Sequence, residues 1–335
     1  MKSIVFFNNK GGVGKTTLLC NVSSYIATEL GKKVLVIDAD PQCNATSYVL
    51  SDKTLDNIYS KQKRLTIDSF IQPVTRGKGD SLVRIEPLES ENFGFDIIPG
   101  DPKLAIAEDI LATDWKDAVA GNERGLQTTY VFKLITELYS DYDYVFFDVG
   151  PSLGAINRSI LIGSDYFVIP MSVDLFSLMA IDNINVSLNK WKTSIERGLG
   201  DYATNEGHDY IISEKVQSWN LKFCGYVMQQ YIAKVAKGEK KHVKAFEKIS
   251  KKIPDKIKTQ LVSYYSNNEE EYEPLLGEVE NLYSLIPMSQ TSKVPVFLLK
   301  SKDGVVGAHF AKVLAAKELY EKISFNILKN IGSNK

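Results

Sequence analysis

Short apolar runs alternate with longer amphipathic stretches along the chain. Seven runs are nearly continuous in apolar residues, which is typical of strands covered on both faces of a parallel sheet: Ile4–Phe7, Val34–Ile37, Ile97–Ile98, Val145–Phe147, Phe167–Ile169, Tyr226–Met228 and Leu282–Ile286. Four stretches between them repeat apolar residues at the 3.6-residue period of a helix: Thr16–Leu30, Leu126–Tyr139, Leu178–Ile195 and Ala308–Leu328. This alternation predicts an α/β fold with a doubly wound, mostly parallel sheet and helices on both faces.

Three segments fit the alternation less well. Residues 51–88 contain prolines, glycines and scattered charges, and we expect an excursion beside the sheet rather than a second domain. Arg197–Asn220 is polar and predicts a connection, while residues 230–280 predict a basic helical insertion. We therefore expect a single domain over residues 1–335.

The composition is that of an ordinary globular protein, with 335 residues, 44% apolar and 24% charged. Lys plus Arg (40) nearly equals Asp plus Glu (41), so a DNA site would have to be a local patch. No signal-peptide pattern and no apolar run of the ~20 residues that cross a bilayer is evident, so we expect a cytoplasmic protein. Cys20, Cys43 and Cys224 have no CxxC spacing, which argues against zinc or redox chemistry.

A glycine-rich loop follows the first apolar run and opens the first predicted helix. Its sequence, Lys10–Thr17 (KGGVGKTT), lets backbone N–H groups converge on phosphate oxygens beside the positive end of a helix dipole. We expect Lys15 to contact the β and γ phosphates of ATP, Thr16 to bind Mg²⁺ and Thr17 to approach the α phosphate. The candidate nucleotide-binding residues are Gly11, Gly12, Val13, Gly14, Lys15, Thr16 and Thr17.

Three carboxylates end predicted strands. Asp38 and Asp40 close the second strand, and Asp148 follows three apolar residues as a Walker B carboxylate does. Because ligands of open α/β sheets bind at the carboxyl ends of the strands, these side chains are candidates for the Mg²⁺ and water shell. The alternative for Asp38 and Asp40 is a helix cap at the strand end.

These motifs together resemble the ParA/MinD family of deviant Walker ATPases. The resemblance rests on KGGVGKTT, on Val34–Thr46 (VLVIDADPQCNAT) and on Val145–Gly154 (VFFDVGPSLG). It implies an ATP-dependent homodimer in which hydrolysis acts as a switch and Lys10, just ahead of the glycines, reaches the partner's ATP.

The resemblance also assigns roles to the carboxylates. It implies that Asp40 positions or polarises the attacking water and that Asp38 supports the metal shell of Thr16 and Asp148. The candidate catalytic residues are thus Lys10, Lys15 and Asp40. No arginine finger is identifiable, so we expect slow hydrolysis and an activator protein as a partner.

The C-terminal half resembles the family more loosely, as in an uncharacterised ParA-like subgroup with a longer C-terminal part. Leu285-Ile286-Pro287 is similar to the segment that packs beside adenine, and Gln229 or Gln230 ends a strand where relatives often carry asparagine. Gln229 and Pro287 are therefore candidate adenine contacts. The alternative for these glutamines is a polar residue that closes a strand.

A basic helical face is expected between Gly238 and Pro254. Its apolar residues form one stripe, and the lysines gather almost opposite: Lys241, Lys244, Lys248, Lys251 and Lys252. Such a face could bind DNA without recognising bases, and the protein would then associate with the nucleoid. The alternative is a helix whose lysines are simply solvated.

The last amphipathic stretch, Ala308–Ile331, invites comparison with the terminal membrane helix of MinD relatives. Its apolar residues at helical spacing favour a helix that covers the sheet, so we expect no membrane anchor: Leu314, Leu319, Ile323, Ile327 and Ile331.

Other functional classes lack their residues. No paired cysteines are present to hold an iron–sulfur cluster, no cluster of convergent charges suggests a metabolite pocket, and His208, His242 and His309 are isolated. Two hypotheses remain: an ATPase that partitions or positions DNA or another cargo, and an ATP-gated module that regulates an effector protein without binding DNA.

Overall fold

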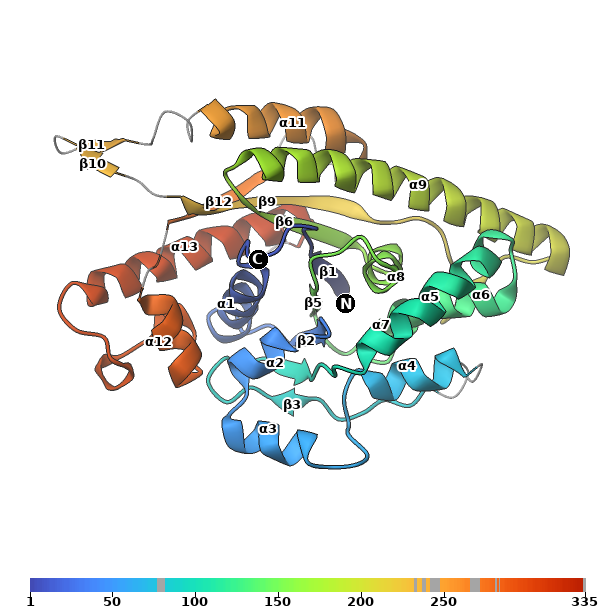
Figure 1. Ribbon diagram of the computed structural model, residues 1–335, viewed down its shortest axis with the longest axis horizontal. Helices are drawn as coiled ribbons and strands as arrows, with labels where there is room; N and C mark the ends of the chain where they lie inside the picture. The colour runs from blue at the N-terminus through green and yellow to red at the C-terminus, as the bar shows by residue number, and fades with distance from the viewer. Residues whose placement is uncertain are drawn as a thin grey trace.

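An eight-stranded sheet lies at the centre of the computed structural model, which describes residues 1–76, 82–231, 234–236, 239–241, 248–265, 272–280, 282 and 284–333 (Figure 1). The strand order is β12-β9-β6-β1-β5-β2-β4-β3, and neighbours pair in parallel except the antiparallel edge pair β3–β4. The strands are β1 (Lys2–Phe6), β2 (Val34–Ala39), β3 (Leu88–Glu89), β4 (Asp96–Ile98), β5 (Tyr144–Val149), β6 (Tyr166–Ser172), β9 (Lys222–Tyr231) and β12 (Leu275–Glu280). The predicted doubly wound α/β fold is confirmed.

Helices cover both faces of the sheet (Figure 1). One face carries α4 (Asp68–Thr75), α5 (Leu104–Val119), α7 (Val131–Glu137), α8 (Ala155–Gly163), α9 (Leu175–Glu206) and α11 (Lys252–Leu261). The other carries α1 (Lys15–Thr28), α2 (Asn44–Val49), α12 (Leu285–Ser292) and α13 (His309–Asn330). The helices α3 (Asp52–Tyr59) and α6 (Glu123–Thr129), the hairpin β7 (Ile211–Ile212)–β8 (Lys215–Val216) and the hairpin β10 (Lys234–Ala236)–β11 (Glu239–Lys241) lie outside the main sheet.

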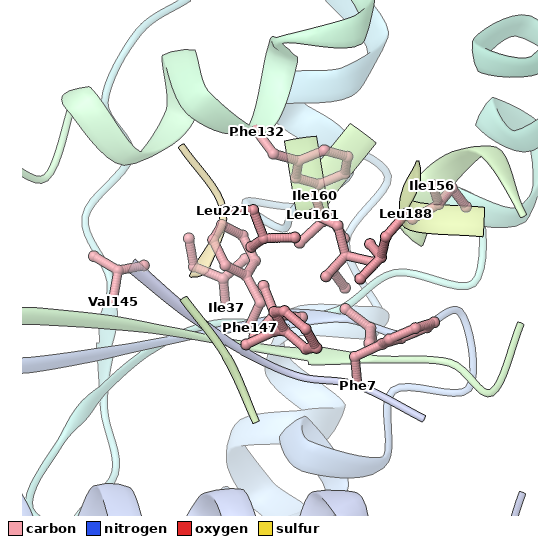
Figure 2. Close-up of a cluster of buried hydrophobic side chains, with 14 of the residues drawn as sticks. Phe7, Ile37, Phe132, Val145, Phe147, Ile156, Ile160, Leu161, Leu188 and Leu221 are labelled. Atoms are coloured by element: carbon pink, nitrogen blue, oxygen red, sulfur yellow. The ribbon is translucent and has the colours of Figure 1, made fainter. Parts of the chain in front are cut away.

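Each central strand divides its apolar side chains between the two faces. In β5, Val145 and Phe147 pack on one face, and Tyr144 and Phe146 on the other. Figure 2 shows the first face, where Phe147 and its neighbours meet side chains from α7, α8 and α9. Because both faces are buried, the strands consist of nearly unbroken apolar runs, as the sequence indicated.

Six of the seven predicted strands are present, and the seventh prediction is wrong. Leu282–Ile286 is not a strand, because Leu285 and Ile286 open α12. The strand in this part of the chain is β12, whose Gly277 and Glu278 interrupt the apolar run. A Cβ atom at Gly277 would lie 2.6 Å from Ile323 of α13, so close helix packing explains the glycine.

Two of the three segments expected outside the α/β alternation, residues 51–88 and Arg197–Asn220, contain regular structure. In the predicted excursion, α4 contributes Phe70, Ile71 and Val74 to the core, whereas α3 has no buried residue. The prediction of a connection over Arg197–Asn220 is wrong in its first half, since α9 continues to Glu206. Its small and polar residues are accommodated because this end of the helix packs on α5 rather than on the sheet.

The last helix, α13, covers β9 and β12 and contacts α1. Ile323 and Ile327 are buried as predicted, whereas Leu314 is 61% exposed and the prediction of a core position is wrong there. Val313 and Ala316 are buried instead, in the same apolar cluster as Val296 and Phe297. None of the described helices is long and apolar enough to cross a bilayer.

Two glycines of α9 provide a test of the packing of α9 on α5. A Cβ atom at Gly198 would lie 2.0 Å from the carbonyl oxygen of Ala118 in α5, whereas one at Gly200 would meet nothing within 4 Å. We expect Gly198→Ala to lower the free energy of unfolding by about 1–3 kcal/mol through overpacking. Gly200→Ala should raise it by about 0.5–1 kcal/mol, since alanine favours the helix. Urea denaturation measures both, and equal effects would contradict the packing.

Candidate nucleotide-binding site

The glycine-rich loop connects β1 to α1 at the carboxyl ends of the central strands. Asn8, which the sequence analysis did not single out, fixes its start: Nδ2 donates to the carbonyl of Pro170 in β6 at 2.8 Å, and Oδ1 accepts from the backbone N–H of Lys10 at 2.9 Å. Gly12 and Gly14 have φ of 71° and 73°, a region that side chains disfavour. Asn8 therefore fixes the first residues of the loop, and the positive φ angles at Gly12 and Gly14 require glycine.

A pocket of about 530 Å³ opens beside this loop. The phosphate loop and strand-end residues form one side of it, and residues of α2, α12 and their connections form the other. The lining residues are Gly12, Val13, Gly14, Lys15, Thr16, Thr17, Asp40, Gln42, Asn44, Ser47, Tyr48, Pro151, Gln290 and Lys293. Six of the seven predicted loop residues thus line one cavity, and the seventh, Gly11, is exposed next to Pro151.

Lys15 and Thr16 line the pocket, and the buried carboxylate of Asp148 lies next to them. Lys15 is 8% exposed, and burial lowers the pKa of its ammonium group while the charges of Asp148 and Asp40 oppose that effect. The Thr16 hydroxyl donates to Asp148 Oδ2 at 2.8 Å. Asp148 is fully buried, and burial, followed by the charge of Asp38, raises its pKa well above the ordinary value.

One carboxylate oxygen at this position is unsatisfied. Asp148 Oδ1 is buried and has no hydrogen-bond partner among the described residues. A buried carboxylate with a free oxygen beside a threonine hydroxyl and a lysine suits a hard cation and the phosphates it accompanies. Thr16 and Asp148 therefore fit a Mg²⁺ site.

Asp38 is directed away from that position. Its Oδ2 accepts from the backbone N–H of Thr46 at 2.8 Å and from the Thr46 hydroxyl at 2.6 Å, so it caps the N-terminal turn of α2. Burial raises its pKa to about 6, against these hydrogen bonds. Thr46 also accepts from the N–H of Gly100 at 2.8 Å. The geometry thus matches the helix-cap alternative for Asp38, and Thr46 is a site residue that the sequence analysis missed.

Asp40 lines the pocket and is 6% exposed. Its Oδ1 accepts from the backbone N–H of Gln42 at 2.9 Å, which fixes the carboxylate at the start of the β2–α2 connection. A Cβ atom at Gly150 would lie 3.3 Å from the same oxygen, so the loop after β5 passes close to Asp40. The carboxylate of Asp40 thus lies beside the phosphate loop and is separate from the pair formed by Thr16 and Asp148.

Lys10 is held by its own chain. Its Nζ forms an ion pair with Asp174, which is the N-cap of α9 and also accepts from the backbone N–H of Ser177 at 3.0 Å. Partial burial acts to raise the pKa of Asp174, but the bonds from Lys10 and Ser177 lower it below the ordinary value. The side chain of Lys10 is thus outside the pocket lining in the single chain.

The two predicted adenine contacts differ in position. Gln229 is buried near the end of β9, and its Nε2 donates to the carbonyl of Gly14 at 3.3 Å. It therefore supports the backbone of the phosphate loop. Pro287 is exposed in the first turn of α12 and is not among the pocket residues. The same helix and its C-cap place Gln290 and Lys293 there instead. The side chain of Gln230 lies outside the described residues.

The predicted basic face is only partly helical. Lys241 lies in β11, which pairs with β10, so the prediction of a helix starting at Gly238 is wrong: the cross-strand hydrogen bonds of this hairpin override the helical spacing. Lys244 lies outside the described residues. Lys248, Lys251 and Lys252 are exposed next to the start of α11, whose Ile253 is buried as the apolar stripe predicted.

Comparison with known proteins gives the family. Residues 1–200 match the family model described as AAA domain. The sporulation initiation inhibitor protein Soj of Bacillus subtilis is 30% identical over 55% of this chain and 63% of its own length. The chromosome-partitioning ATPase Soj of Thermus thermophilus is 27% identical over 65% of this chain and 75% of its own. This chain belongs to the ParA/MinD-like P-loop ATPases. The match to the Bacillus protein spans less than two thirds of that relative.

Solved structures support the fold of this ParA/MinD-like ATPase along the whole chain. A crystal structure of a Corynebacterium diphtheriae protein superposes with a TM-score of 0.76 at 27% identity and covers 100% of both chains. A putative plasmid partition protein of Borrelia burgdorferi, solved with AMPPNP, has a TM-score of 0.56 at 18% identity and covers 98% of each. The C-terminal part that follows residue 200 therefore belongs to a known arrangement.

Thr46 allows a test of how the site is held. Thr46→Val nearly preserves the shape but removes the donor to buried Asp38 and the acceptor for Gly100, so we expect the free energy of unfolding to fall by about 2–4 kcal/mol. Thr113→Val is the control, because among the described residues that hydroxyl bonds only to the carbonyl of Asp109, on an exposed helix face. Urea denaturation of both variants measures the difference, and similar losses would contradict this role of Thr46.

Proposed function

We propose that this chain is a partition-type ATPase that binds Mg²⁺-ATP, dimerises in the ATP state and hydrolyses ATP slowly as a switch. The observation that carries the proposal is the grouping of Lys15, Thr16 and Asp40 at one pocket, with Asp148 bonded to Thr16 behind it and a second lysine, Lys10, at the start of the loop. A single lysine is enough for a generic phosphate loop. The second one needs a different partner, and the ATP of another copy supplies it.

The pocket chemistry supports ATP with Mg²⁺ as the ligand. The loop backbone and Lys15 would hold the phosphates, and Thr16 with Asp148 would hold the cation, which supplies charge neutralisation at the phosphates. Asp40 would orient the attacking water, because its carboxylate is at the pocket surface rather than committed to a buried cap. Gln290 and Lys293 are better placed than Pro287 to meet the base.

The contact between Lys10 and Asp174 explains why dimerisation would depend on ATP. Without a triphosphate from a second copy, Lys10 is neutralised by the carboxylate of its own chain. Phosphates carry more negative charge than one carboxylate, so they would compete for Lys10 once two copies meet. An activator protein would then be needed to speed hydrolysis, in keeping with the switch.

Trapping the ATP state tests the switch. We expect Asp40→Ala to bind Mg²⁺-ATP but not hydrolyse it, and to accumulate as a dimer with twice the chain mass of 37.5 kDa. Lys15→Ala should lose nucleotide binding and stay monomeric, since the ammonium group that would hold the phosphates is removed. Light scattering gives the mass, and calorimetry gives ATP binding. The same mass for Asp40→Ala with and without ATP would refute the switch, as would unchanged ATP affinity in Lys15→Ala.

The cargo we propose is DNA bound without sequence preference, in the cytoplasm and at the nucleoid. Lys248, Lys251 and Lys252 are exposed at the start of α11, where the same segment packs through Ile253. A dimer would present this patch twice, and linked sites gain avidity without new contacts. If DNA binding fails, an ATP-gated module acting on an effector protein is the remaining hypothesis.

Charge reversal tests the DNA hypothesis. We expect Lys248→Glu with Lys251→Glu to abolish ATP-dependent binding to a duplex while ATP binding and dimerisation remain. The matched control, Lys300→Glu with Lys302→Glu, changes the same charge at exposed positions on another surface. Fluorescence anisotropy should show that parent affinity falls by orders of magnitude between ~50 and ~200 mM salt. Equal binding by the variant and the control would refute this patch.

A further inference from the structure

The first turn of α8 holds the loop that follows β5, residues 150–154, which we call the β5–α8 loop. Asn157 is 2% exposed, and its Nδ2 donates to the carbonyls of Gly150 and Ser152, each at 2.7 Å. A side-chain amide nitrogen carries two hydrogens, so each carbonyl can take one of them. The backbone of the loop is therefore tied to one buried side chain of the helix that follows it.

Glu108 of α5 holds the same turn of α8. Its Oε2 accepts from the backbone N–H of Ile156 at 3.0 Å, and its Oε1 accepts from that of Ala155. The first N–H groups of a helix have no partner within the helix, so this carboxylate completes the start of α8. A Cβ atom at Gly154 would clash with Oε1 of Glu108, which explains the glycine that ends the loop. The helix that carries Asn157 is thus fixed by α5.

The β5–α8 loop also meets the nucleotide pocket. A Cβ atom at Gly150 would lie 3.3 Å from Oδ1 of Asp40, so the loop backbone passes close to that carboxylate. Pro151 lines the pocket and lies against Gly11 of the phosphate loop. The same oxygen of Asp40 accepts from the backbone N–H of Gln42. The orientation of the Asp40 carboxylate therefore depends both on that bond and on where the backbone of Gly150 is held.

We infer that Asn157 is a positioning residue for ATP hydrolysis, which acts on Asp40 through the β5–α8 loop. The inference rests on the proposed function, in which Asp40 orients the attacking water. Without the donor of Asn157, the backbone of Gly150 would be free to move and the Asp40 carboxylate would gain room to turn. A misplacement of about 1 Å can cost on the order of a hundredfold in rate. Lys15 and Thr16 lie outside these contacts, so ATP affinity should not change.

Asn330 of α13 provides a matched control. It is 5% exposed, and its Nδ2 donates to the carbonyls of Cys224 at 2.7 Å and Glu273 at 2.8 Å. It thus makes the same pair of carbonyl bonds at similar burial, but neither carbonyl belongs to the β5–α8 loop. Asparagine to leucine at either position removes both donors at a similar side-chain size, so both variants should lose stability.

We expect Asn157→Leu to lower kcat for Mg²⁺-ATP hydrolysis at least about tenfold while the Kd for ATP stays within about twofold of the parent value. Asn330→Leu should keep the kcat of the parent. Hydrogen–deuterium exchange of the nucleotide-free protein should be faster over residues 150–156 in Asn157→Leu and unchanged there in Asn330→Leu. Glu108→Gln, which keeps the shape of the side chain but weakens its hold on α8, should lower kcat by a smaller factor at unchanged ATP affinity.

A parent-like kcat in Asn157→Leu overturns the inference, whether or not exchange over the loop changes. An equal loss of kcat in Asn330→Leu also overturns it, because destabilisation alone would then explain the effect, and so does a parallel loss of ATP affinity. If Asn157→Leu does not fold, Glu108→Gln decides, and a parent-like kcat there overturns the inference. If exchange over residues 150–156 responds as expected but the parent does not hydrolyse ATP, it is the proposed function that fails, and the positioning role fails with it.

Discussion

Asp38 and Asp148 stand side by side in the register of β2 and β5, and both carboxylates are fully buried at the edge of the sheet. Two buried carboxylates in adjacent positions are costly unless each finds donors. The protein satisfies the first with Thr46 and leaves one oxygen of the second without a partner among the described residues. Asp38 therefore holds α2 through Thr46, which in turn accepts from the N–H of Gly100, whereas Asp148 has an oxygen that a cation beside Thr16 can complete.

The surrounding elements keep that arrangement in place and connect it to the surface. Asn8 ties the phosphate loop to β6, and Gln229 supports it from the end of β9. On the other side, Asp174 couples Lys10 to α9, a helix that runs from the phosphate loop to its tight contact with α5 at Gly198. The ion pair thus links the start of the phosphate loop to a helix of 32 residues that also packs on α5.

Much of the fold was predictable because strands buried on both faces leave an unmistakable apolar run, as in β1, β2 and β5. Prediction failed where packing partners decided the structure. Leu282–Ile286 has the composition of a strand but the spacing of a helix, and the actual strand, β12, contains Gly277 because α13 packs against it. The basic segment failed similarly, since pairing of β11 with β10 is invisible to a helical projection.

The sequence by itself determined the phosphate loop, the strand-end carboxylates and the family, because backbone conformation and phosphate chemistry demand glycines, a lysine and a threonine at fixed spacing. Only the tertiary structure decided the roles that depend on neighbours distant in the chain. It turned Asp38 toward Thr46, placed Gln290 and Lys293 rather than Pro287 at the pocket, and paired Lys10 with Asp174. Local spacing fixes which chemistry a segment can offer, whereas the partners that satisfy a buried or charged group are set by the packing of the whole chain.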